Sequence, residues 1–185
     1  MRPQSDRYDP TTVALHWIVA GGVALNWLVG QSLHYVPKDW GHTDRQIHVY
    51  IGSTLTLVLL TRLAWRLTRG NHIVEPRTPM TIAAKAVHGL LYALLLTILG
   101  LGLFAVWNKG GPYFGGLIEI EPWGDADKAA RKALSIKVVG IHELLSNIVM
   151  GLALVHAGAA LMHHHVMKDD VLTRMIPWLR GRKAD

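Results

Sequence analysis

The segment VVGIHELLSNIVMGLALVHAGAALM, residues 138–162, decides the fold of this chain. Its one charged residue is Glu143, and it is long enough to cross a hydrocarbon core, which needs roughly 20 apolar residues. His142 and His156 stand 14 residues apart within it. At about 100° and 1.5 Å per residue, their rings return to within roughly 40° of one helix face, about 21 Å apart along the axis. The segment therefore predicts a membrane-crossing helix with two metal-binding side chains on one stripe.

Three earlier segments have similar length and apolarity, at about residues 13–33, 47–67 and 82–107. The chain is therefore predicted to be an all-α integral membrane four-helix bundle, with residues 1–185 in a single domain. The first segment lacks a convincing small-residue cleavage site, so we expect a retained helix rather than a signal peptide. Several glycines in these spans would let helices approach closely or make room for a flat cofactor, and packing alone explains them equally well. They are Gly21, Gly22, Gly52, Gly100, Gly102, Gly151 and Gly158.

The basic residues of the chain indicate its topology. The net charge is +6, but the lysines and arginines flank apolar spans instead of forming one soluble face, which argues against nucleic-acid binding. Twelve of the 19 fall in the amino-terminal tail, the second connection and the carboxyl tail, and the remaining seven share their loops with six acids. By the positive-inside rule, both termini are predicted to be cytoplasmic.

The longest connection, residues 108–137, lies on the outer side in this topology. It opens with the turn-rich run Asn108-Lys109-Gly110-Gly111-Pro112. Residues 126–134 are predicted to form a short helix lying at the outer interface.

Four histidines lie in the apolar spans, where an ionisable side chain is costly and indicates a function. Because successive spans alternate in direction, His48 and His142 are predicted to share the outer level, and His16 and His156 the inner level. Each pair can hold one iron from opposite faces. Two imidazoles fill both axial positions of a haem, which favours electron transfer over oxygen binding.

The spacing of these histidines does not by itself prove that they bind a metal. A lone intramembrane histidine is often only hydrogen-bonded between helices, and His42 can stand in for His48. Zinc is disfavoured because His142-Glu143 lacks the second histidine of an H-E-x-x-H motif. The absence of cysteine excludes thiolate-held clusters and covalent attachment of haem.

Two more histidines are candidates for a neighbouring role. His163 falls seven residues after His156, where it can contact a quinone or relay protons, or simply cap the helix together with His164 and His165. His88, early in the third span, can contact a haem propionate, a quinone or a neighbouring carbonyl, and it is the reserve axial ligand.

An ordered set of motifs along nearly the whole chain resembles the bacterial cytochrome b561 family. The set is Leu15-His16-Trp17, Ile47-His48, Arg62 and Arg66, His88 with Tyr92, Asn108 to Phe114, His142-Glu143, His156, His163-His164, Lys168-Asp169 and Leu172-Thr173-Arg174-Met175. Each motif alone is weak, but their order is specific.

This resemblance implies a multi-pass protein of the bacterial inner membrane, embedded in lipid. It implies two b-type haems with His16, His156, His48 and His142 as axial ligands, and ubiquinone as a redox partner. Some family members are thought to oxidise superoxide at the outer face and reduce ubiquinone, so the expected activity is that of a superoxide:quinone oxidoreductase.

The electron donor stays open between superoxide and another one-electron donor. Basic residues of the outer connection can steer a small anion, although lipid phosphates or neighbouring acids explain them equally well. They are Lys109, Arg131, Lys132 and Lys137. The alternative function is a relay subunit that passes electrons between quinone and a larger redox partner protein. A third possibility is a structural membrane protein whose histidines bind no haem.

Overall fold

The computed structural model describes residues 8–35, 37, 41–69, 78–113, 116–122, 124, 127–176 and 179, without the side chains of residues 41, 42 and 44. Four of its helices are long and apolar enough to cross a membrane. They are α1 (Pro10–Ser32), α2 (Gly41–Thr68), α3 (Pro79–Lys109) and α4 (Lys128–Met162). The prediction of an all-α four-helix membrane bundle is confirmed, and the helices cover the four predicted spans to within one residue.

Three of the long helices begin directly after a residue whose side chain caps the helix. Asp9 caps α1 by accepting a hydrogen bond from the Thr12 backbone N–H, and Thr78 and Thr81 form a reciprocal capping box at the start of α3. Asp127 accepts from the Ala130 N–H at the start of α4. These caps satisfy backbone donors that the first turn of a helix leaves without partners.

The outer connection differs from the prediction. The expected short interfacial helix at residues 126–134 is wrong, because from Lys128 onward these residues are the first turns of α4. No proline or glycine stands between Lys128 and Gly140 to stop a helix that Asp127 has started. The Asn108 side chain of α3 donates to Arg131 O at 3.1 Å and to Ser135 Oγ at 2.8 Å, which holds these turns against α3.

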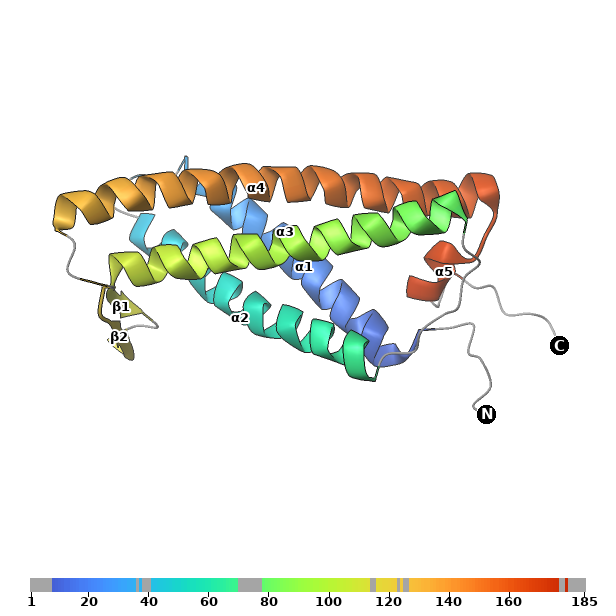
Figure 1. Cartoon of the computed structure of the whole chain (residues 1–185), viewed down its shortest axis with the longest axis horizontal. Helices are drawn as coiled ribbons and strands as arrows, with labels where there is room; N and C mark the ends of the chain where they lie inside the picture. Colours follow the sequence, from blue (N-terminus) through green and yellow to red (C-terminus); the bar gives the residue numbers. More distant parts are fainter. Residues whose placement is uncertain are drawn as a thin grey trace.

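A small antiparallel hairpin precedes α4 and was not predicted. Strand β1 (Gly111–Tyr113) pairs with β2 (Ile118–Ile120), with Pro112 opposite Glu119. Gly110 turns the chain from α3 into β1 with φ of 66°, a conformation that favours glycine. Figure 1 shows the hairpin at the end of the bundle opposite the start of α1 and the carboxyl-terminal helix.

The carboxyl-terminal part of the chain folds back beside α1. Helix α4 passes into a π-helix, η2 (His163–Met167), which Lys168 ends in the left-handed region, and a short helix α5 (Val171–Met175) follows. The Trp17 indole N–H donates to Met175 O at 2.8 Å. This bond ties the last helix to the first at one end of the bundle (Figure 1).

The bundle packs as two helix pairs. Helix α1 packs chiefly on α2, and α3 on α4, while α1 and α4 touch at few places. Few side chains are fully buried, and many large apolar ones face outward, as expected where lipid is the solvent. The loose contact between the pairs leaves room for the site described below.

The Asp9 side chain does more than cap α1, because it also accepts from Trp65 Nε1 of α2 at 3.0 Å and from Thr12 Oγ1 at 2.6 Å. We expect Asp9→Ala to cost about 2 kcal/mol of stability, against about 1 kcal/mol for Asp127→Ala, which removes a cap alone. Thermal unfolding of both variants in one detergent measures the difference. Equal losses would show that the Asp9–Trp65 bond contributes nothing.

Candidate functional site

The four span histidines meet as the two pairs that the sequence predicts. His16 of α1 faces His156 of α4 with ring centroids 6.5 Å apart, and His48 of α2 faces His142 of α4 at 6.1 Å. The ring planes cross at 73° and 81°. Helix α4 therefore contributes one ring to each pair, at two levels along its axis.

Both separations fit a metal ion between the rings. A metal–imidazole bond of roughly 2.0–2.1 Å, together with the size of the ring, puts the centroids of two opposed ligands about 6 Å apart. Within the described part of the chain, no cluster of three or more His, Cys, Asp or Glu side chains could hold a metal. A zinc site needs three or four such ligands, whereas a haem iron needs only two from the protein. The donor set therefore fits haem.

Hydrogen bonds fix the tautomer of the outer pair. His48 Nδ1 lies 3.1 Å from Asn26 O of α1, and His142 Nδ1 lies 2.9 Å from Ile98 O of α3. A carbonyl oxygen only accepts, so each Nδ1 carries the proton and donates it. The Nε2 lone pair of each ring is then free for a metal, which is the usual arrangement of metal-ligating histidine.

The same two helices give these rings space through glycine. Gly30 follows Asn26 by one helical turn, and a Cβ there would lie 3.1 Å from His48 Cε1. Gly102 follows Ile98 by one turn, and its Cβ would lie 3.3 Å from His142 Cε1. Sequence reasoning singled out Gly102 but missed Gly30. The signal was a repeated spacing, in which a glycine follows the residue with the accepting carbonyl by four positions, and it is informative only once the facing histidine is known.

The inner pair lines a largely apolar cavity between all four helices. His16 and His156 share this cavity with His88, Arg62 and Tyr92. The His88 ring centroid lies 5.0 Å from that of His156, which is too close for a metal between the two rings. The geometry therefore favours His16 over His88 as the partner of His156.

Arg62 is a buried cation in the inner cavity, only 9% exposed. Its Nε donates to the Tyr92 hydroxyl at 2.8 Å, and its Nη1 donates to Thr12 O at 3.1 Å. Both acceptors are uncharged. Arg62 thus holds its full positive charge beside the inner histidines.

A second, more polar cavity opens at the end of the bundle that carries the β1–β2 hairpin. Lys109 lines it together with Arg45 of α2 and Tyr113 of β1, and burial raises the pKa of the Tyr113 phenol. The other residues predicted to steer anions do not line this cavity. Arg131 donates to Gly124 O, and Lys132 and Lys137 are exposed on the first turns of α4. Arg45 was not among the candidates, because only the fold shows that it meets Lys109.

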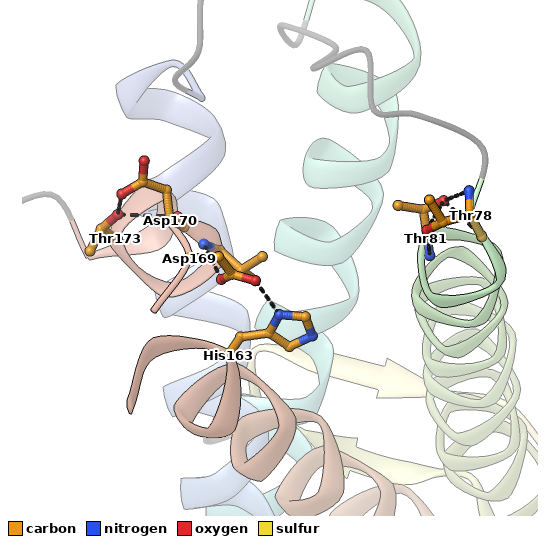
Figure 2. A network of polar contacts seen from close by, with 7 residues as sticks. Thr78, Thr81, His163, Asp169, Asp170 and Thr173 are labelled. Carbon is orange, nitrogen blue, oxygen red and sulfur yellow. Dashed lines mark hydrogen bonds and ion pairs between the residues drawn. The ribbon is translucent and has the colours of Figure 1, made fainter. Parts of the chain in front are cut away.

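His163 lies outside the inner cavity and pairs with the carboxyl-terminal segment. Its Nδ1 is 2.5 Å from Asp169 Oδ2, as Figure 2 shows. Partial burial favours the neutral form of Asp169, but the hydrogen bonds from His163 and the Val171 backbone N–H, together with the nearby Arg174, outweigh burial and lower the pKa of this carboxyl. The His163 side chain is 17% exposed, against 39% for Asp169. The side chain of His42, the alternative to His48, lies outside the described residues.

A membrane-spanning four-helix bundle with paired histidines at two depths is the architecture of a membrane electron-transfer cytochrome. The chain belongs to the prokaryotic cytochrome b561 family, whose family model matches residues 7–178. It is therefore a bacterial membrane protein of electron transport.

Several relatives match along almost their whole length. Cytochrome b562 of Cereibacter sphaeroides is 31% identical over 182 residues, covering 94% of this chain and 97% of the relative. Cytochrome b561 homolog 1 of Escherichia coli is 31% identical over 178 residues, covering 93% and 98%. The probable superoxide oxidase CybB of Yersinia pestis is 26% identical over 178 residues, covering 95% and 98%.

The glycines against the outer pair give a test of the site. We expect Gly30→Ala and Gly102→Ala each to push a histidine ring away from its carbonyl and weaken haem retention at the outer site, roughly tenfold as for other supporting contacts of metal ligands. Gly21→Ala and Gly100→Ala, on the same helices with open space at the Cβ, are the controls. Haem per chain after dilution and washing measures the effect, and equal haem in all four variants would contradict it.

Proposed function

We propose that this chain is a di-haem b protein that oxidises superoxide at the periplasmic face and reduces ubiquinone in the bacterial inner membrane. The reaction balances when two superoxide ions give two O₂ and two electrons, and one ubiquinone takes those electrons with two protons to become quinol. The observation that carries the proposal is the pair of histidine clamps, 6.1 and 6.5 Å between ring centroids, at two levels of α4. The similarity to a probable superoxide oxidase supports the choice of donor.

In this proposal His48 and His142 would hold an outer haem, and His16 and His156 would hold an inner haem. When bound, the haems supply one-electron carriers at two depths of the membrane. The protein fixes the ring tautomers at the outer site through Asn26 O and Ile98 O. Aliphatic side chains of all four helices line the inner cavity and would limit the access of water to it.

The proposed topology keeps residues 1–185 as one domain with both termini in the cytoplasm. The start of α1 and helix α5 lie at one end of the bundle, and the β1–β2 hairpin at the other (Figure 1). The cytoplasmic assignment rests on the excess of lysine and arginine at the end that carries the termini. The outer pair then faces the periplasm.

The outer cavity would attract an anionic donor. Lys109 and Arg45 both line it, and the two cations lie close enough to repel each other. A concave site with like positive charges raises the local concentration of a small anion. Arg131, Lys132 and Lys137 add positive charge on the neighbouring turns of α4 and would act at longer range.

The inner end would supply protons to the reduced quinone. His163 donates its Nδ1 proton to Asp169, so when the ring is also protonated at Nε2 it could hand that Nε2 proton to a quinone oxygen and take up another proton from the cytoplasm. His88, which lines the inner cavity beside His156, would be the second residue to contact a quinone or a haem propionate.

Haem content of ligand variants tests the central assignment. We expect two b-type haems per unsubstituted chain, and about one in each of His16→Ala, His48→Ala, His142→Ala and His156→Ala, because each removes one axial ligand. His88→Ala and His164→Ala should keep both. Pyridine haemochrome quantification of purified protein gives the count. Two haems per chain in all four ligand variants would refute the assignment. Loss of a haem in His88→Ala would indicate that His88 is a ligand.

Activity of the single purified chain separates the enzyme from a relay subunit. We expect superoxide consumption with one quinol formed per two superoxide ions. Asp169→Asn should slow quinone-dependent reoxidation roughly tenfold or more while haem content and reduction by superoxide stay unchanged, because it removes a proton-relay partner. Thr173→Ala, a change in the same segment, is the control. Haem reduction that occurs only with a partner protein present would support the relay instead.

A further inference from the structure

The two histidine pairs sit in different electrostatic surroundings. Arg62 and Arg66 are both close enough to His16 to act on it electrostatically, and Arg62 lines the cavity itself. At the outer level the acid Glu143 follows His142 directly and acts on that ring. Two arginines, one of them buried, therefore act on the inner pair, whereas at the outer pair the acid Glu143 partly offsets the positive charge of Arg45 and Lys109 in the neighbouring cavity.

Burial makes Arg62 the dominant charge at the inner site. A guanidinium stays protonated in proteins, and a charge removed from water acts more strongly on its neighbours. The Tyr92 hydroxyl and Thr12 carbonyl that hold Arg62 bring no negative charge. At the outer site Glu143 is about half exposed and pairs with His34 at 3.2 Å, so its field is weaker but of opposite sign.

Reduction adds one negative charge at a bis-histidine haem site. A nearby fixed cation stabilises that added charge and raises the reduction potential, whereas a nearby carboxylate lowers it. We propose that Arg62 makes the inner haem site the stronger electron acceptor, with Glu143 weakening the outer one, so that electrons run inward from the periplasmic to the cytoplasmic side. This inference rests on the proposed two-haem function and assigns its direction.

The bias has a physical purpose in a bacterial membrane. An electron moving inward travels toward the negative side, against the membrane potential. Each electron released by a one-electron donor outside therefore needs a more favourable acceptor inside, where two electrons and two protons convert quinone to quinol. A buried cation at a fixed position provides this difference in reduction potential without a conformational change.

Potentiometric titration of the purified two-haem protein tests the inference. We expect Arg62→Gln to lower the midpoint potential of the inner haem and Arg62→Lys to retain it. Glu143→Gln should raise that of the outer haem. Arg69→Gln, an exposed arginine at the end of the same helix, is the matched control and should change neither. The visible spectra of single-ligand variants identify which haem is which.

The outcomes separate this inference from the proposed function. Fewer than two haems in the unsubstituted chain would refute the function itself. Two haems with an inner potential that is unchanged or higher in Arg62→Gln would overturn the role of Arg62 alone, and would indicate that Arg62 serves only to anchor a haem carboxylate. If Arg62→Gln fails to retain the inner haem, Arg66→Gln must lower the inner potential, and an unchanged value overturns the proposal.

Discussion

Opposed imidazole rings held about 6 Å apart, twice along one helix, are the constraint on which the rest of the structure depends. Two rings at that separation leave a gap that side chains cannot fill without destroying the site. The helix pairs α1–α2 and α3–α4 therefore pack closely within themselves and loosely against each other. Gly30 and Gly102 help to keep this space open, because a methyl group at either position would crowd a histidine ring.

Membrane embedding explains why such a loosely packed bundle is tolerated. The backbone of each long helix satisfies its own hydrogen bonds, and lipid solvates the apolar side chains that a soluble protein would have to bury. Stability then depends on a few polar ties between helices, which are strong in an apolar medium. Asp9 to Trp65, Asn108 to Ser135 and Trp17 to Met175 are ties of this kind, and each lies near an end of the bundle.

The two ends of the bundle differ in their charged residues. The outer cavity with Arg45 and Lys109 suits the arrival of an anion, whereas the buried Arg62 suits the retention of an electron. The His163–Asp169 pair sits beyond the inner cavity, where the π-helix lets α4 turn toward α5 (Figure 2). π-Helical turns are frequent at functional sites, because the extra residue redirects side chains. In the proposed function, electron acceptance and proton supply would thus lie next to each other at the cytoplasmic end.

The sequence by itself determined the four helices and the histidine pairing. Apolar length predicts spans, and the 14-residue spacing of His142 and His156 places both on one face, because both signals are local and periodic. Only the tertiary structure decided that α4 begins at Lys128, that Arg45 joins Lys109, and that Asn26 and Ile98 supply carbonyls to the outer rings. These features depend on residues far apart in the chain. Hydrogen bonds and electrostatic fields act through space, and hydropathy and helical periodicity carry no information about which distant groups will meet.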